Sequence, residues 1–296
     1  MLQLSNPYAP IEQVFLEQVA AKNISLFIKR EDLSHPFISG NKWRKLKYHL
    51  LAAHAQKANL LVTYGGAYSN HLLATAAAGA KYGFKTHAFV RGQVETNMQL
   101  ALCKAFGMNL QFVSREEYKQ KDALFASYFG SNQLAYQVPE GGAGLHGELG
   151  VAESVKDWEL SEELKTPTHV FTSVGTGSTM RGLLRGVLEN KLATKVHGVV
   201  VLKGAEAMAA EFADFSADSF VLHHRFCGSG YAKWDEALLA FIQSFASSTG
   251  VLLDVVYEAK LMQGILTLIE EDYFAPGETV LAYHNGGLIG GLSAYQ

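Results

Sequence analysis

The sequence predicts an α/β protein with parallel sheets. Short apolar runs rich in β-branched residues end in glycine or polar turns, and each is followed by a longer segment with helical periodicity. Some runs, such as 199–202, are apolar at every position, as in strands covered on both faces. Strand–helix alternation at this spacing is typical of parallel strands joined by crossover helices.

In the first half of the chain, the expected strands are β-branched or aromatic and the expected helices carry an apolar stripe. Leu46, Leu50 and Leu51, for example, share one face of the first helix. Strands are expected at 24–29, 60–63, 86–90, 110–113 and 135–138, and helices at 41–56, 70–82, 96–106, 116–129 and 147–163.

The pattern restarts after Pro167. Strands are expected at 169–174, 196–202, 220–226 and 279–284, and helices at 179–189, 205–212, 235–247 and 257–271. Before this restart, the segment 140–150 is rich in glycine and is either a hinge or a surface loop. We therefore expect two α/β domains, with a ligand between them at the carboxyl ends of strands.

Composition excludes several classes of protein. The 296 residues are 48% hydrophobic and 18% charged, which rules out a disordered chain. A net charge of −3 gives no basic footprint for nucleic acid, and no run reaches the roughly 18 apolar residues of a membrane span. The N-terminus lacks the pattern of a signal peptide, so we expect a cytoplasmic protein with neither nucleic-acid nor membrane partners.

Metal binding and disulfide bonding are not expected. Cys103 and Cys227 lie far apart and match neither a disulfide framework nor a zinc spacing, so they are expected to be reduced thiols. The adjacent His223 and His224 lack a third ligand at metal spacing.

The first motif that could carry chemistry is Ser-Gly-Asn-Lys-Trp-Arg-Lys-Leu, residues 39–46, where the first helix begins. Lys42 lies at the positive end of the helix dipole beside Arg44, Lys45 and Lys47, and both effects lower the pKa of its amine. A neutral amine is what a Schiff base with an aldehyde requires. The alternative is an ordinary basic first turn of a surface helix.

A second motif, Tyr-Gly-Gly-Ala-Tyr-Ser-Asn-His, fills residues 64–71 between a strand and a helix. Ser69 or Asn70 could simply cap that helix. In the functional interpretation, their side chains and the free backbone N–H groups face a ligand instead.

The third motif, Val-Gly-Thr-Gly-Ser-Thr at 174–179, is the strongest by spacing and context. Its glycines and hydroxyl residues expose backbone donors at the start of a helix, which is an arrangement that binds phosphate. A dinucleotide fingerprint is a weaker interpretation, because Met180 occupies the third glycine position and Lys203 follows the next strand where an acidic residue is required. A purely structural tight turn is the remaining alternative.

Further candidates are Tyr257 and Glu258 at the start of a helix, the run His-Asn-Gly-Gly at 284–287, and Cys-Gly-Ser-Gly-Tyr at 227–231. In this order, the motifs resemble the 1-aminocyclopropane-1-carboxylate (ACC) deaminase and D-cysteine desulfhydrase family. Members are pyridoxal-phosphate enzymes with the tryptophan synthase β-like fold, fold type II. The resemblance covers nearly the whole chain. It implies two open, twisted, mostly parallel sheets flanked by helices, with a large cofactor-binding domain from residues 1–46 and 161–296 and a small α/β domain from 47–160.

The resemblance also implies residue roles. Lys42 would form the Schiff base with pyridoxal 5'-phosphate, Asn70 would bond the ring hydroxyl, and Glu258 would face the pyridine nitrogen. The phosphate would be held by Gly175, Thr176, Gly177, Ser178 and Thr179. Proton transfer would be carried out by Lys42, Ser69 and Tyr257. The substrate would contact Ser69, Asn70, His71, Tyr231, Tyr257 and Asn285.

The substrate stays open at this point. Tyr257 followed by Glu258 resembles the deaminases, and a carboxylate at the ring nitrogen favours the protonated, more electron-withdrawing ring. Asn285, however, stands where deaminases tend to have Leu and desulfhydrases Thr, and Tyr68 replaces a common Gln. Asn285 favours a polar substrate side chain.

We expect a deaminase or lyase that converts a small amino acid, ACC-like or D-cysteine-like, into a 2-oxo acid and ammonia. The alternatives are a D-cysteine desulfhydrase, another pyridoxal-phosphate β-eliminase or racemase, and a non-catalytic pyridoxal-phosphate-binding protein. The resemblance implies a homodimer.

Overall fold

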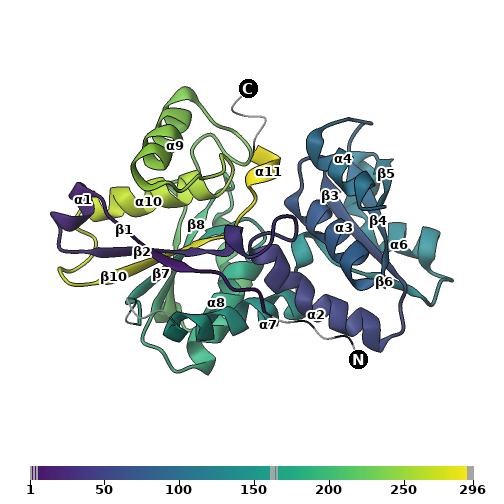
Figure 1. Ribbon diagram of the computed structural model, residues 1–296, viewed down its shortest axis with the longest axis horizontal. Helices are drawn as coiled ribbons and strands as arrows, with labels where there is room; N and C mark the ends of the chain where they lie inside the picture. The colour runs from purple at the N-terminus through teal and green to yellow at the C-terminus, as the bar shows by residue number, and fades with distance from the viewer. Residues whose placement is uncertain (1, 3, 5, 161–163, 165, 292–296) are drawn as a thin grey trace.

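The computed structural model describes residues 2, 4, 6–160, 164 and 166–291, and within them the chain forms two sheets (Figure 1). The large sheet has the strand order β1-β2-β10-β7-β8-β9, and the small sheet has the order β5-β4-β3-β6. All neighbouring strands are parallel except the edge pair β1–β2. The α/β class and the two mostly parallel sheets are as predicted.

The large sheet combines strands from both ends of the chain. Its strands are β1 (Ile11–Val14), β2 (Ser25–Arg30), β7 (His169–Val174), β8 (Lys195–Val200), β9 (Phe220–His223) and β10 (Thr279–His284). Its helices are α1 (Glu17–Ala20), α8 (Ser178–Glu189), α9 (Glu236–Thr249) and α10 (Glu258–Glu270), and α11 (Leu288–Gly291) follows β10. Its central strands are buried on both faces, which explains their continuous apolar sequence.

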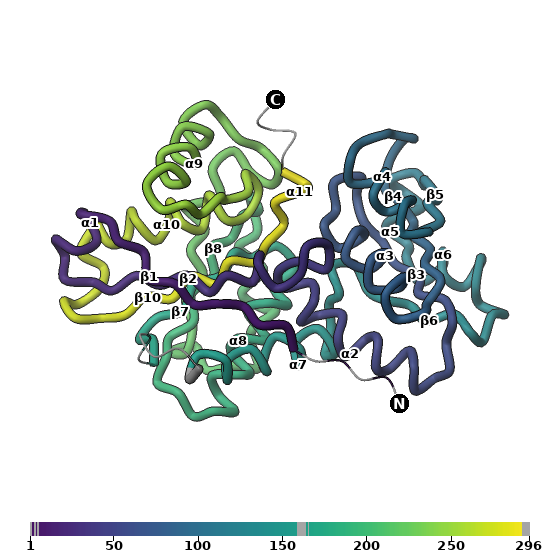
Figure 2. The backbone as a smooth tube through the Cα atoms, viewed as in Figure 1, coloured from purple at the N-terminus to yellow at the C-terminus, as the bar shows by residue number. Residues whose placement is uncertain are grey.

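The small sheet is continuous in sequence. Its strands are β3 (Leu60–Gly66), β4 (Lys85–Arg91), β5 (Asn109–Val113) and β6 (Ala135–Gln137). Its helices are α3 (Asn70–Tyr82), α4 (Met98–Ala105), α5 (Arg115–Lys119) and α6 (Lys121–Phe129). The tube in Figure 2 shows that the segment after β10 leaves the large sheet and reaches toward this half of the molecule.

Helix α2 (Asn41–Ala55) connects the two sheets. Its Leu46 and Leu50 are fully buried in one cluster with Leu61 of the small sheet. Its other side packs against α7 (Leu145–Glu153), where a Cβ on Gly150 would collide with the carbonyl oxygen of Arg44. The predicted domain boundary at residue 46 falls within α2, and the division into 1–46 with 161–296 and 47–160 stays a prediction.

Three expected helices differ from those observed. The segment 116–129 is two helices, because Gln120 leaves the helical region with φ −104° and ψ 56° and a capping box at Ser114 starts a separate turn. Helix α7 ends at Glu153 and continues as a 3₁₀ turn over Ser154–Leu160, and residues 161–163 lie outside the described part. Residues Glu206–Phe212 also form a 3₁₀ helix.

Three histidines form a chain of hydrogen bonds across the large sheet. His169 Nδ1 lies 2.9 Å from His197 Nε2, and His197 Nδ1 lies 3.0 Å from His223 Nε2. The chain ends where His169 Nε2 meets Glu278 Oε2 at 3.1 Å. The His197 ring is fully buried and stacks on Phe171, with ring centroids 4.2 Å apart. Burial lowers the pKa of His197 to about 2 and that of His223 to about 4, so both imidazoles are neutral at physiological pH.

Candidate active site

The loops that follow β2, β10 and β7 converge, because these strands are parallel neighbours and their carboxyl ends lie at one edge of the sheet. The closest approach is between Gly40 and the start of the loop after β10. The amide of Asn41 donates to the carbonyl of Asn285 at 3.1 Å. Gly40 has φ +67°, and a Cβ there would collide with the same carbonyl oxygen. The backbone therefore fixes the start of α2 against Asn285.

Lys42 is the second residue of α2 and is partly buried. Its Nζ donates to Asn41 Oδ1 at 2.6 Å. Burial lowers the pKa of this amine to about 8, and the charges of Glu258 and Asp254 oppose that shift in part. The direction agrees with the sequence prediction, but the largest cause is burial. Two of the neighbouring cations named there, Arg44 and Lys47, are paired with carboxylates.

Glu258 is the first residue of α10 and is fully buried. Its Oε1 accepts hydrogen bonds from Ser173 Oγ at 3.0 Å and from Asn285 Nδ2 at 3.2 Å. Burial raises the pKa of this carboxyl to about 7, with a further upward contribution from Asp254, and His284 and the two hydrogen-bond donors oppose the shift. The site therefore holds a carboxyl that takes up a proton more readily than an exposed glutamate.

Asp254 fixes the turn that presents Glu258. Its Oδ1 accepts from the amides of Val256 and Tyr257 at 2.8 and 3.0 Å, and its Oδ2 accepts from the amide of Glu258 at 3.0 Å. Val256 and Tyr257 lie just before α10 and Glu258 is its first residue, so none of the three amides has an acceptor within the helix. Asp254 thus orders the turn that leads into α10 and sets the backbone position of Glu258.

The glycine-rich loop 175–177 lies between β7 and α8, as the phosphate-site prediction requires. Gly177 has φ +79°, and the first amides of α8 have no acceptor within the helix. The hydroxyls of Thr176 and Ser178 lie 3.3 Å apart, and Thr179 Oγ1 accepts from Asn41 Nδ2 at 2.9 Å. The loop is therefore connected directly to the residue beside Lys42.

Lys45, one turn after Lys42, was not singled out from the sequence. It is 4% exposed and has no hydrogen-bond or ion-pair partner among the described residues. Burial, and then the charge of Lys42, hold the pKa of this amine well below its usual value. Its stem lies against Gly142 and Gly147 of the glycine-rich segment. A buried amine without a counter-ion is an environment that favours an anion.

These donors fit pyridoxal phosphate. The amides and hydroxyls of 175–179 provide a donor-rich place for a phosphate at the start of α8. Lys42 supplies the amine, and Glu258 supplies a carboxyl for the ring nitrogen. His71 Nδ1 is a further buried polar atom with no partner in the described part of the chain.

At the start of α3, three neighbouring side chains make different contacts; they are those of Ser69, Asn70 and His71. The Ser69 side chain makes no capping hydrogen bond. Asn70 Nδ2 donates to the carbonyl of Gly287 at 3.1 Å, so it connects α3 to the segment after β10. His71 Nε2 donates to Thr63 Oγ1 at 2.8 Å, which leaves its Nδ1 as an acceptor.

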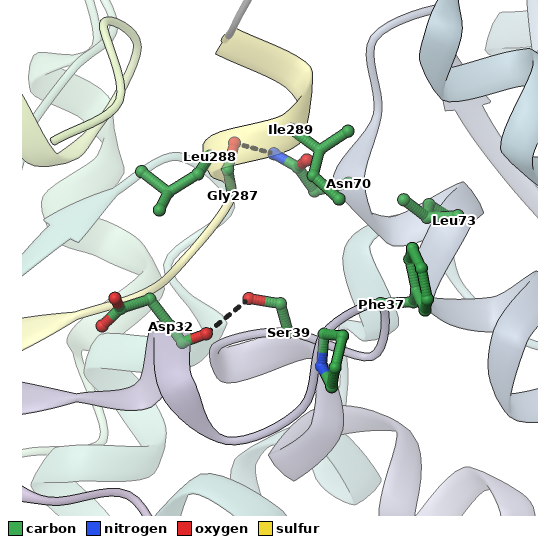
Figure 3. Close-up of a pocket in the computed structure, with 9 residues that line it drawn as sticks. Asp32, Phe37, Ser39, Asn70, Leu73, Gly287, Leu288 and Ile289 are labelled. Atoms are coloured by element: carbon green, nitrogen blue, oxygen red, sulfur yellow. Dashed lines mark hydrogen bonds between the residues drawn. The ribbon is translucent and has the colours of Figure 1, made fainter. Parts of the chain in front are cut away.

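A pocket of about 130 Å³ lies between the loop after β2, the start of α3 and the segment after β10 (Figure 3). Asn70 and Gly287 form one wall, and Asp32 and Ser39 form another, where Ser39 Oγ donates to the Asp32 carbonyl at 3.3 Å. Its lining residues are Asp32, Pro36, Phe37, Ser39, Asn70, Leu73, Gly287, Leu288 and Ile289. The pocket is thus next to α2's start, in the space between the two sheets.

Tyr257 and Tyr231 form a pair beside the glycine-rich loop. The hydroxyl of Tyr257 donates to that of Tyr231 at 3.2 Å, and a Cβ on Gly175 would touch the Tyr257 ring at 3.3 Å. Burial holds the pKa of the Tyr257 hydroxyl well above its usual value, so it keeps its proton. Tyr231 is 47% exposed and reaches solvent.

The described residues hold no cluster of side chains that could bind a metal ion, and none of their helices is long and apolar enough to cross a membrane.

Besides Lys45, the sequence analysis did not identify Asn41, Ser173 or Asp254. Asn41 stood within a quoted motif, but its partners are far away in sequence, and Ser173 was counted only as part of a strand. Asx capping could have suggested Asp254, because it precedes the expected helix by three residues.

Comparison with known proteins identifies the family of this chain. Residues 5–286 match the model of a family described as pyridoxal-phosphate-dependent enzymes. A putative ACC deaminase of Thermotoga maritima is 29% identical, over 98% of this chain and 96% of the relative. A bifunctional mitochondrial D-cysteine desulfhydrase/ACC deaminase of Arabidopsis thaliana is also 29% identical, over 90% of this chain and 73% of the relative.

A solved structure gives the same result for the fold. The crystal structure of an ACC deaminase homologue superposes with a TM-score of 0.84 at 25% identity, and the match covers 95% of this chain and 90% of that one.

Proposed function

This chain belongs to the pyridoxal-phosphate-dependent enzymes, and we propose that it converts a small amino acid into a 2-oxo acid and ammonia, with Lys42 as the cofactor lysine. The observation that carries the proposal is the convergence of three groups at one edge of the large sheet. Lys42 supplies an amine, Glu258 a carboxyl, and the loop 175–179 an anion site, and all three are joined through Asn41 and Asn285. These groups match the aldehyde, ring nitrogen and phosphate of the cofactor.

When bound, pyridoxal phosphate supplies an aldehyde that links to amines and a ring that withdraws electrons from the substrate's α-carbon. Lys42 Nζ moves protons at that carbon. Its pKa of about 8 lets the amine exist in both protonation states near neutral pH, as a general acid–base requires. Asn41 Oδ1 orients it through the 2.6 Å hydrogen bond.

Ser69 and Tyr257 act on the substrate side. The Ser69 hydroxyl makes no capping hydrogen bond at the start of α3, so it can bind a substrate carboxylate. The Tyr257 hydroxyl keeps its proton and can donate it as a hydrogen bond or, at the reacting atoms, as an acid.

We propose ACC as the preferred substrate. The sequence argument against ACC was the polar side chain of Asn285. That side chain is 8% exposed, and its amide donates to Thr172, Ser173 and Glu258. With its donors occupied, Asn285 no longer favours a polar substrate, whereas Glu258 favours the strongly electron-withdrawing ring that opening of a cyclopropane requires.

The test uses purified protein loaded with pyridoxal phosphate and assayed with ACC and D-cysteine in parallel. We expect a visible absorption band that is absent in Lys42→Ala, and 2-oxobutanoate from ACC. A matched Lys47→Ala variant, which changes a lysine on the same helix, should retain the band. Pyruvate from D-cysteine alone would assign the protein as a desulfhydrase. Failure to bind the cofactor after reconstitution would refute the proposal as a whole.

We also propose a homodimer, which the family resemblance supports. Sedimentation equilibrium at micromolar concentration should give twice the mass of the chain, and a monomer would refute the dimer without affecting the catalytic proposal.

A further inference from the structure

An unbroken path of hydrogen bonds leads from the amine of Lys42 to the carboxyl of Glu258. Lys42 Nζ donates to Asn41 Oδ1 at 2.6 Å. Asn41 Nδ2 donates to Asn285 Oδ1 at 2.8 Å, and Asn285 Nδ2 donates to Glu258 Oε1 at 3.2 Å. Two side-chain amides therefore connect the two ionisable groups on which the proposed chemistry depends.

The path has one direction only. Each amide accepts through its oxygen and donates through its nitrogen, so a donor must stand at one end and an acceptor at the other. Turning the Asn285 amide over would place its oxygen against the Glu258 carboxyl and its NH₂ group against that of Asn41. Ser173 fixes the same orientation of Asn285, because its hydroxyl donates to Glu258 and can therefore only accept from the Asn285 amide.

Burial and backbone contacts hold the path in place. Asn41, Asn285 and Glu258 are 6%, 8% and 1% exposed. The Asn41 amide donates to the Asn285 carbonyl, and Gly40 makes the close approach possible. The two amides are thus aligned by the main chain and shielded from competing water, so the hydrogen bonds are stronger than at a surface.

We propose that Asn285 is a positioning residue that couples Lys42 to Glu258 through Asn41, and does not bind the substrate itself. This inference rests on the proposed function, because it assigns a role within the same site. When Asn285 is replaced by an apolar side chain, Glu258 loses one of its two side-chain donors and Asn41 loses the acceptor that orients it.

The consequence can be measured at Lys42 without any cofactor. The negative charge of Glu258 raises the pKa of the Lys42 amine, and the Asn285 donor favours that charged form of Glu258. Loss of Asn285 should therefore protonate more of Glu258 and lower the pKa of Lys42. The other ionisable groups that face this pair are unchanged in every variant; they are Asp254, His284, Lys45 and His71.

The experiment is competitive labelling of amines in the full-length, cofactor-free protein, with the Lys42 peptide quantified by mass spectrometry from pH 6 to 9. In Asn285→Leu we expect the Lys42 pKa to fall by about half a unit, which is roughly a threefold higher labelling rate at pH 7. In a Glu258→Gln background, which has no charge to couple, the same change should have little effect. Thr172→Val removes a different hydrogen-bond partner of the Asn285 amide, and in this variant the Lys42 amine should be labelled at the wild-type rate.

An unchanged Lys42 pKa in Asn285→Leu would overturn the inference. So would an equal shift in both backgrounds, or the same shift in Thr172→Val, because each would mean a general disturbance of the loop. Asn285→Ala provides the same readout if the leucine variant does not fold. Since no cofactor or turnover is involved, a negative result leaves the proposed function intact, and failure of the protein to bind pyridoxal phosphate leaves this result unaffected.

Discussion

Acid should destabilise this protein partly through the imidazole of His197, and His197→Gln removes that contribution. The unfolded imidazole takes up a proton below its ordinary pKa of 6.5, whereas the folded one stays neutral down to a pKa of about 2. The stabilisation is therefore complete above pH 6.5 and is lost as the pH falls. At pH 5 the unfolded group is about 1.5 pH units below its pKa, which corresponds to a loss of about 2 kcal/mol.

The assay is urea unfolding at pH 7.5 and pH 5, and the quantity compared is the drop in the free energy of unfolding between them. His197→Gln should be less stable than wild type at pH 7.5, because His169 and His223 lose a hydrogen-bond partner, at a cost of about 1–3 kcal/mol. Between pH 7.5 and pH 5, however, the free energy of unfolding of His197→Gln should fall by about 2 kcal/mol less than that of wild type. Outside the three-histidine chain the variant is unchanged, so the difference reports on that chain and chiefly on His197, its central ring.

The matched control is His54→Gln, which removes an exposed histidine of α2. The free energy of unfolding of this variant should fall between pH 7.5 and pH 5 by as much as that of wild type. If His197→Gln and wild type lose the same free energy on acidification, the buried histidine chain does not hold its rings neutral, and the reasoning is refuted.

Three further predictions follow from other features. Gly150→Ala should push α7 away from the carbonyl of Arg44 and lower the melting temperature by several degrees; a calorimetric scan equal to wild type would contradict the tight contact. Asp254→Ala should cost about 1–3 kcal/mol, because three backbone amides at and just before the start of α10 lose their acceptor, and an unchanged urea midpoint would count against that role of Asp254. The rate at which the cofactor-free protein binds pyridoxal phosphate should rise with pH up to about 8 and then level off, since only the neutral Lys42 amine reacts; a rate that stopped-flow absorbance finds constant from pH 6 to 9 would exclude Lys42 as the reacting amine.

The sequence predicts the bounds of an element correctly where that element is well buried and a turn or capping residue marks each end. The strands β7 and β10 and the helix α3 agree with the predicted ranges residue for residue. The edge strand β1 was missed, because Ile-Glu-Gln-Val is only four residues long and alternates weakly. The break at Gln120 was also missed, since it involves neither proline nor glycine.

For the site, the sequence suggests which residue types matter but not their partners. Lys42, Glu258 and the loop 175–179 were singled out because each has a local signal. The roles of Asn41 and Asn285 depend on a contact between residues 41 and 285, and no local pattern encodes a contact at that separation. The main cause of the Lys42 pKa shift could not be predicted either. It is burial, which depends on the packing of distant parts of the chain.

The central place of β10 in the large sheet also has a consequence for the order of folding. All four strands of the small sheet are made within one stretch of chain, so that sheet can form early during synthesis. The large sheet lacks the strand between β2 and β7 until residues 279–284 have been made, more than a hundred residues after β7. Because such long-range pairing is slow, the exposed edges of β2 and β7 are open to wrong partners in the meantime. The hydrogen bonds that join Lys42 and Glu258 run through Asn285, so the reactive centre can be completed only after β10 has inserted between β2 and β7.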